Sequence, residues 1–341
     1  MNKDQIEGLK KELSSPRNIV IIPHKNPDGD AVGSVTALYG YLIQLGHKVT
    51  MISPNDFPTF LKWMDYSDLF VNYEQESKKA DTLINEADLI FNLDHNAFHR
   101  AGDMETILSE VTSTFVMIDH HQQPDDFASY MYSDTAMSST CEMIYHFLEM
   151  LGDTEKITPA MATAMYTGIL TDTGSFKYRS TTSTTLRVAA NLVDKGANSE
   201  SINRKIYDVN TPSRMKLLGV ALNNMVILKE YRTAFITLTQ KELDDNNFKK
   251  GDTEGFVNYA LSLDGIVFAQ ILIEKKSESI IKTSLRSKGD FDVNQLARDN
   301  WEGGGHKNAA GGKSDLSMED TVKKLISILP SYEKELHEVV I

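Results

Sequence analysis

The sequence predicts an α/β protein: a parallel-sheet domain with flanking helices, then a helical connector and a smaller α+β domain. Over the first part of the chain, apolar runs of strand length alternate with helical patterns, which is typical of a parallel sheet with helices on both faces. Three of these runs lead into Asp or His residues. Because the carboxyl ends of parallel strands meet at one edge of a sheet, we expect these side chains to gather there.

The amino-terminal part carries the clearest pattern. Residues 3–14 have the spacing of a short amphipathic helix that ends before Pro16, and apolar residues at helical spacing over 31–45 stop at Gly46. The remaining expected strands and helices of this part are 19–22, 49–52, 89–94 and 115–119, and 139–151, 159–170 and 183–195. Residues 1–196 are therefore expected to form the larger domain.

Residues 197–228 are expected to be a helical connector, because they lack the Gly, Ser or Pro richness of a flexible linker. Residues 229–341 are expected to form the smaller domain, which includes a glycine-rich run at 303–312. Its expected strands and helices are 233–238, 265–273 and 279–285, and 254–263, 293–299 and 318–329.

Composition narrows the classes of protein to consider. The 341 residues include 35 basic and 48 acidic side chains, a net charge of −13, which argues against binding long duplex nucleic acid through a basic surface. The single cysteine, Cys141, excludes an internal disulfide framework and suits a reducing compartment. We find no signal-peptide core and no run of membrane-spanning length, so we expect a cytoplasmic protein without a membrane partner.

Side chains that suit metal chemistry follow three strands and one helix. They are His24, Asp28 and Asp30, then Asp94, then Asp119, His120 and His121, and lastly Asp172. Five carboxylates and three imidazoles at element ends exceed what capping needs, and the carboxylates would repel one another unless cations held them. Taken alone, the loop at 24–30 also fits a solvated turn with an Asp N-cap.

Two divalent ions would compensate this charge. Ions about 3.5–4 Å apart can share a water, lower its pKa and clamp the oxygens of a phosphoryl centre. Mixed Asp and His ligation favours Mn²⁺, while Mg²⁺, Co²⁺, Zn²⁺ and Fe²⁺ stay open on ligand type.

The order of these motifs resembles a known family. The pattern His24-x-x-x-Asp28-x-Asp30, then Asp94, Asp119-His120-His121, Asp172 and a Gly-Gly-Gly-His run ending at His306 is similar to the DHH phosphoesterase superfamily with its DHH-associated carboxyl domain. The resemblance covers nearly the whole chain. Its length and lack of extra domains point to the small nanoRNase and pAp-phosphatase branch, the NrnA-type enzymes.

The resemblance implies a role for each residue. One Mn²⁺ would be held by His24, Asp28 and Asp94, and the other by Asp30, Asp94, His120 and Asp172, with Asp94 as the bridge. Asp119 would orient an imidazole. His121 would face the scissile phosphate as a hydrogen-bond donor or general acid.

In the smaller domain the resemblance implies a phosphate site. The glycines would let backbone N–H groups approach a phosphate, and Arg286 would clamp two phosphate oxygens. The residues expected to bind substrate are Ser284, Arg286, Gly303, Gly304, Gly305, His306 and Asn308.

The activity implied is hydrolysis of short oligoribonucleotides to 5′-mononucleotides and of 3′-phosphoadenosine 5′-phosphate (pAp) to AMP, in a cleft between the two domains. Linear or cyclic dinucleotides such as pApA, and pyrophosphate or polyphosphate, are alternative substrates. A catalytically silent nucleotide-binding regulator is the alternative outside enzymes. A homodimer is compatible with all of these.

Overall fold

The computed structural model describes residues 1–340. It divides into two compact units, Met1–Val209 and Asn210–Ile341. The division falls inside the segment 197–228: helix α8 (Ser199–Tyr207) belongs to the first unit, and helix α9 (Pro212–Asn223) belongs to the second.

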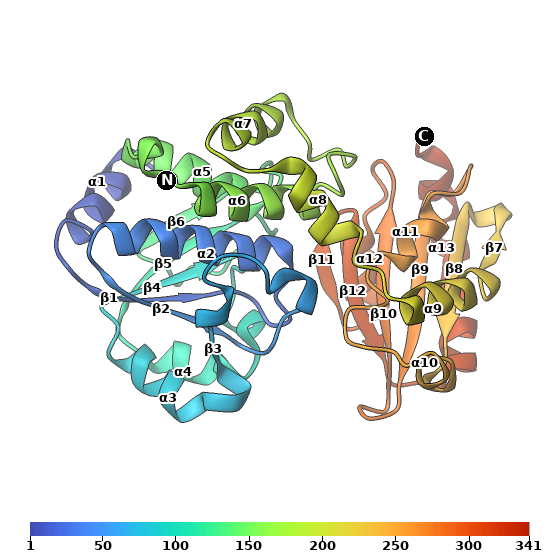
Figure 1. Cartoon of the computed structure of the whole chain (residues 1–341). Helices are drawn as coiled ribbons and strands as arrows, with labels where there is room; N and C mark the ends of the chain where they lie inside the picture. Colours follow the sequence, from blue (N-terminus) through green and yellow to red (C-terminus); the bar gives the residue numbers. More distant parts are fainter. Residues whose placement is uncertain (341) are drawn as a thin grey trace. The chain divides into compact units, whose positions relative to one another are not determined.

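The first unit is built on a six-stranded sheet in the order β3-β2-β1-β4-β5-β6, in which every neighbouring pair is parallel (Figure 1). The strands are β1 (Asn18–Ile22), β2 (Lys48–Ser53), β3 (Val71–Asn72), β4 (Leu89–Leu93), β5 (Thr114–Asp119) and β6 (Tyr130–Ser133). The order reverses between β1 and β4. A reversal of this kind opens a crevice at the carboxyl ends of the two strands, where α/β sheets bind ligands.

Helices cover both faces of this sheet. Figure 1 shows α2, α5 and α6 on one face and α3 and α4 on the other. The helices of this unit are α1 (Lys3–Glu12), α2 (Gly29–Gln44), α3 (Tyr73–Asn85), α4 (Glu105–Glu110), α5 (Thr140–Leu151), α6 (Pro159–Asp172), α7 (Ser183–Asp194) and α8. In β1, Ile19 and Ile21 enter the core under α2, whereas Val20 and Ile22 enter the core on the opposite face. This alternation is the period of two that a strand buried on both faces requires.

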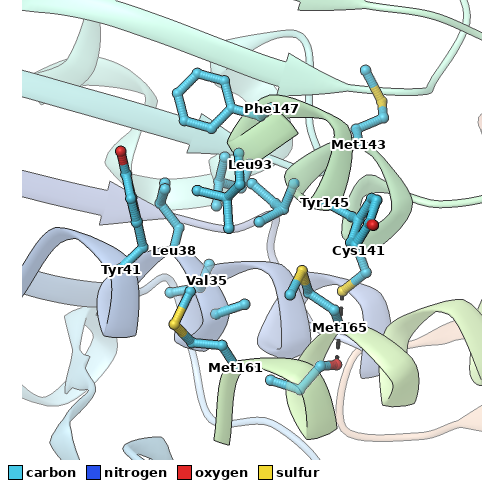
Figure 2. Close-up of a cluster of buried hydrophobic side chains, with 14 of the residues drawn as sticks. Val35, Leu38, Tyr41, Leu93, Cys141, Met143, Tyr145, Phe147, Met161 and Met165 are labelled. Carbon is cyan, nitrogen blue, oxygen red and sulfur yellow. Dashed lines mark hydrogen bonds between the residues drawn. The ribbon is translucent and has the colours of Figure 1, made fainter. Parts of the chain in front are cut away.

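Helices α2 and α6 pack closely because small residues line their contact. A Cβ atom on Gly33 would lie 2.6 Å from the Ala164 carbonyl oxygen, and one on Gly29 would lie 2.4 Å from Thr171 Oγ1. Figure 2 shows apolar side chains of α2, α5 and α6 packed together, with Leu93 of β4 and Cys141 of α5 among them. The close packing holds the start of α2 beside the end of α6.

The second unit contains a mixed six-stranded sheet in the order β11-β12-β10-β9-β8-β7, in which only β8 and β9 are parallel neighbours. The strands are β7 (Val226–Leu228), β8 (Thr233–Leu238), β9 (Phe268–Lys275), β10 (Ile280–Ser287), β11 (Gly304–His306) and β12 (Ala309–Ser314). The helices are α9, α10 (Gln240–Asp245), α11 (Phe256–Leu261), α12 (Val293–Asn300) and α13 (Met318–Glu338). Separate apolar cores lie on the two faces, one with α12 and α13 and the other with α9 and α11.

The predicted fold class is confirmed, and the differences are local. Strands β3, β6, β7, β11 and β12 were not expected, because they are short and lack a long apolar run. The glycine-rich run forms the hairpin β11–β12 rather than a loop. Within residues 1–340, none of the helices combines the length and apolar character that a membrane crossing requires.

Candidate metal centre

The loop between β1 and α2 carries the first group of polar side chains. Asp28 is the N-cap of α2, and its Oδ1 accepts hydrogen bonds from the backbone N–H groups of Asp30 and Ala31 at 3.0 and 3.1 Å. His24 Nε2 lies 3.9 Å from the same Asp28 oxygen. Asp28 therefore caps the helix and also faces the imidazole, so the capping and ligand roles coexist in one side chain.

A pair of asparagines holds this loop in shape. Asn26 has a left-handed backbone (φ 58°), and its N–H donates to Asn55 Oδ1 at 2.6 Å. Asn55 Nδ2 donates to Asn26 Oδ1 at 3.0 Å. Asn55 follows strand β2, so sequence reasoning had no reason to connect it with residue 26.

Asp94 occupies the centre of the cluster. It follows β4 with a left-handed backbone (φ 61°), and its N–H donates to the carbonyl of Ile118 at 3.1 Å. Its Oδ2 lies 3.4 Å from His24 Nε2, and its Oδ1 lies 3.5 Å from His120 Nε2. The two oxygens of one carboxylate therefore face two different imidazoles, which is the arrangement that a bridging ligand needs.

The remaining expected ligands surround His120. His120 Nε2 lies 3.3 Å from Asp172 Oδ2 and 3.8 Å from Asp30 Oδ2. Asp172 is the last residue of α6, and Asp30 is the second residue of α2. The close packing of these two helices brings the two carboxylates to the same place.

Asp119 and His121 form a pair next to Asp94. His121 Nδ1 donates to Asp119 Oδ1 at 2.7 Å, and the His121 backbone N–H donates to Asp119 Oδ2 at 2.8 Å. Asn96, which was not singled out from the sequence, donates from Nδ2 to the carbonyl oxygens of His121 and Gln122. Hydrogen bonds to Asp119 and from Asn96 therefore hold the loop that follows β5.

Within the first unit, three groups of donor atoms result, in each of which one atom per residue lies within 4.8 Å of the others. The groups are His24, Asp28 and Asp94; Asp30, His120 and Asp172; and Asp94, Asp119 and His121. The structure thus brings together all eight side chains that the sequence singled out in this unit, from segments spread over some 150 positions.

The imidazole orientations suit a metal ion. His24 Nδ1 lies 2.9 Å from the carbonyl oxygen of Lys25, and His120 Nδ1 lies 3.3 Å from that of Met137. A proton on Nδ1 can be donated to each carbonyl, which leaves Nε2 directed at the carboxylates. Metal-bound histidines are held by such hydrogen bonds from the ring nitrogen that does not bind the metal.

The pKa shifts of the buried carboxylates also indicate a site for cations. Burial, reinforced by the negative charges of Asp94 and Asp172, raises the pKa of Asp30 well above its ordinary value. Burial raises the pKa of Asp172 to about 7, and Asp28 and Asp94 add to this effect. Burial opposes ionisation of Asp94 as well, but His120 and His24 outweigh it and hold the pKa of Asp94 well below its ordinary value. The cluster therefore holds more negative charge than its burial tolerates, which bound cations would compensate.

In the second unit, Arg286 and His306 lie on the two strands that flank β12 at one edge of the sheet. Arg286 of β10 and His306 of β11 both lie opposite Ala309 of the intervening strand β12. Their backbones are therefore two strand spacings apart, about 10 Å. Ser284 lies opposite Gly311, so the strip between these polar residues carries only small side chains.

The glycine run and Asn308 make hydrogen bonds within the second unit. The Gly305 N–H donates to Asn294 Oδ1 at 2.8 Å, and the Gly303 N–H donates to the Ala297 carbonyl at 3.3 Å. Asn308 Nδ2 donates to Ser287 Oγ and the Gly289 carbonyl. In this structure α12 engages the N–H groups of Gly303 and Gly305, and their expected approach to a phosphate stays a prediction. Glycine is needed at 303 because a Cβ atom would collide with the Gly311 carbonyl oxygen.

Arg298 lies beside the glycine run, although no sequence pattern indicated it. Its Nε donates to Asn294 Oδ1 at 3.2 Å, and a Cβ atom on Gly304 would lie 3.7 Å from its Cζ. The side chain is exposed. Only the packing of α12 against the hairpin reveals this second guanidinium.

The parallel sheet, the switch point and the clustered ligands define a metal-dependent hydrolase, and comparison with known proteins gives its family. Residues 18–169 match the DHH family, N-terminal domain, and residues 231–334 match the DHHA1 domain. A crystal structure of an exopolyphosphatase-related protein from Bacteroides fragilis is 39% identical with a TM-score of 0.94, covering 99% of this chain and 98% of that one.

Two curated relatives support the same family assignment. The bifunctional oligoribonuclease and PAP phosphatase NrnA of Thermus thermophilus is 28% identical, covering 90% of this chain and 86% of the relative. A probable NrnA of Streptococcus mutans is 29% identical, covering 91% and 94%. The chain belongs to the DHH family of metal-dependent phosphoesterases and carries a DHHA1 domain. These relatives place it in the NrnA-type branch of that family.

Proposed function

We propose that this protein is a Mn²⁺-dependent phosphoesterase that hydrolyses short oligoribonucleotides to 5′-mononucleotides and pAp to AMP. One observation carries the proposal: the two oxygens of Asp94 face separate groups of imidazole and carboxylate donors, His24 with Asp28 on one side and His120 with Asp30 and Asp172 on the other. The substrate class rests on the relatives that are named for these two activities.

The ligand assignment follows the same division. One ion would be held by His24, Asp28 and Asp94, and the other by Asp30, Asp94, His120 and Asp172. When bound, the two ions would supply an activated water and neutralise the charge that develops on the phosphoryl oxygens. Mixed Asp and His donors favour Mn²⁺, with Mg²⁺ or Co²⁺ as substitutes.

The chain's own groups then orient the substrate and move a proton. His121 is held through Nδ1 by Asp119, which leaves Nε2 to face the substrate; in its doubly protonated form the ring would donate from Nε2 to the leaving oxygen of the scissile phosphate. In the second unit, Arg286, Ser284, Gly304 and His306 would bind a phosphate that does not react. The acidic character of the chain suits small anionic substrates with a locally supplied positive charge.

A second candidate is hydrolysis of inorganic pyrophosphate or polyphosphate. The observation that favours it is the likeness to the exopolyphosphatase-related protein of Bacteroides fragilis. Such a substrate uses the same metal centre but needs no nucleotide contact. The two candidates therefore differ in their demands on the second unit.

A substrate panel tests the proposal. The purified protein is incubated with Mn²⁺ and with pAp, pApA, RNA of two to five nucleotides, pyrophosphate or polyphosphate, and products are followed by chromatography and phosphate release. We expect AMP from pAp and mononucleotides from short RNA, no turnover in EDTA, and recovery on adding Mn²⁺. Faster turnover of pyrophosphate or polyphosphate would favour the second candidate. Turnover in EDTA equal to that in Mn²⁺ would contradict the metal-dependent chemistry.

A further inference from the structure

The amino-terminal end of α5 lies directly against the carboxylate of Asp30. The backbone N–H of Thr140 donates to Asp30 Oδ2 at 2.6 Å, and that of Cys141 donates to Oδ1 at 2.8 Å. Asp30 is almost fully buried. A helix amino terminus stabilises a carboxylate through such donors, so α5 fixes both oxygens of this side chain at once.

Thr140 also contacts Asp94. Its Oγ1 donates to Asp94 Oδ1 at 3.0 Å, and the threonine has no exposed surface. This is the Asp94 oxygen that faces His120, whereas Oδ2 faces His24. The left-handed backbone of Asp94 is costly for a residue with a Cβ atom and persists only where the surroundings hold it. The Thr140 hydroxyl is one of the groups that hold it.

We propose that Thr140 is a positioning residue of the metal centre: it sets the separation of Asp30 and Asp94 and so forms the binding position of the ion assigned to Asp30, Asp94, His120 and Asp172. The inference rests on the proposed two-ion centre. Because the hydroxyl touches Oδ1 and not Oδ2, its loss affects this ion more than the ion assigned to His24 and Asp28.

Thr140 is itself held rigidly. Ser139 caps α5 by accepting a hydrogen bond from the Glu142 N–H at 3.0 Å. The buried carboxylate of Glu142 accepts hydrogen bonds from the backbone N–H and hydroxyl of Ser138 and, at 3.0 Å, from Thr185 Oγ1 of helix α7. These hydrogen bonds connect the turn before Thr140 to helices α5 and α7. The position of Thr140 is therefore fixed, and so are the hydrogen bonds that it donates to the two carboxylates.

The test is Mn²⁺ binding to the full-length protein, without substrate, in three variants. Thr140→Val keeps the shape and the backbone N–H but removes the hydroxyl, and Thr140→Ser restores it. Thr167→Val is the matched control, because Thr167 is also fully buried but its hydroxyl donates only to the Thr163 carbonyl within α6. Electron paramagnetic resonance follows free Mn²⁺ during titration and also detects the signal of two magnetically coupled ions.

For wild type and Thr167→Val we expect two bound ions and a coupled signal. For Thr140→Val we expect one of the two dissociation constants to rise about 10- to 100-fold, as when an outer hydrogen bond to a metal ligand is removed, with loss of the coupled signal at stoichiometric Mn²⁺. Thr140→Ser should restore both.

Unchanged constants in Thr140→Val would overturn the inference while leaving the two-ion centre intact. An equal rise in both constants would also overturn it. If Thr140→Val does not fold, Thr140→Ala, which also removes the hydroxyl, takes its place: a rise in one of the two dissociation constants would support the role, and unchanged constants would overturn it. Fewer than two ions in the wild type would contradict the proposed function itself.

Discussion

Asp119 Oδ1 accepts a hydrogen bond from His121 Nδ1 at 2.7 Å, and both residues are almost fully buried. The second Asp119 oxygen accepts the His121 backbone N–H. The imidazole that Asp119 orients is therefore that of His121, whereas Nδ1 of the expected metal ligand His120 faces the Met137 carbonyl. The pair fixes the tautomer and the ring plane of His121.

We expect Asp119→Asn to lower kcat for AMP release from pAp by roughly 100-fold, because an amide does not stabilise the positively charged imidazolium that a general acid requires. KM should change little. The measurement is steady-state kinetics at saturating Mn²⁺, with metal content determined by mass spectrometry as the control. An unchanged kcat with normal metal content would mean that the pair serves only to shape the loop.

Asp94→Asn should abolish turnover and the binding of at least one ion. The amide keeps the size of the side chain but loses one anionic oxygen, so it cannot serve both groups of donors. Metal content and activity are measured on the same preparation, and thermal unfolding checks that the variant folds. Two bound ions and wild-type rates would contradict the bridging role.

Arg286→Ala should raise KM for pAp about tenfold or more and leave kcat within a few fold, since a charged hydrogen bond to a phosphate is worth about 1.5–3 kcal/mol. Arg298→Ala is the companion variant, because its guanidinium lies beside the glycine run. The control substrate is bis-p-nitrophenyl phosphate, which has no second phosphate to bind. A parallel rise in KM for the control substrate would argue against a phosphate clamp.

His146 gives a pH dependence of stability outside the metal centre. The carboxylate of Glu142, whose Oε1 lies 3.8 Å from His146 Nε2, together with Glu149 raises the pKa of His146 against the opposing effect of burial. A group whose pKa is higher in the folded state stabilises it below its unfolded pKa of about 6.5, and this contribution is lost as the pH rises through the folded pKa.

We therefore expect the free energy of unfolding to fall less between about pH 6 and about pH 8 in His146→Gln than in the wild type. The difference should stay below about 1 kcal/mol, because the side chain is partly exposed and water screens the pair. Urea unfolding at both pH values, with equal Mn²⁺ in all samples, measures it. The same pH dependence in both proteins would show that His146 contributes nothing.

Much of the fold, and the residues that make up the metal cluster, could be predicted from local sequence patterns. The runs at 19–22, 89–94 and 115–119 have the length and apolar character of buried strands, and an Asp or His residue lies at or just after the end of each. The helix at 159–170 was placed, but α6 continues to Asp172, which makes that carboxylate part of the helix end. Helix ends assigned in different ways commonly differ by these two residues.

The glycine-rich run shows where local reading was insufficient. Glycines beside a histidine suggested free backbone donors, yet α12 and its Asn294 take up the N–H groups of Gly303 and Gly305. The glycines are required because two backbone segments approach too closely for a Cβ atom. The close approach depends on how α12 packs against the β11–β12 hairpin. A short stretch of sequence does not predict that packing.

The sequence by itself determined the layered α/β architecture and the kinds of side chain at the strand ends, because strand and helix periods and their stop signals are local properties of the chain. The tertiary structure decided which of these side chains meet. It set β1 beside β4, joined Asn26 to Asn55, gave His121 rather than His120 to Asp119, and directed Thr140 at both Asp30 and Asp94. Each of these contacts joins side chains whose approach depends on strand order, helix packing or the path of a loop, and that geometry exists only once the whole unit has packed.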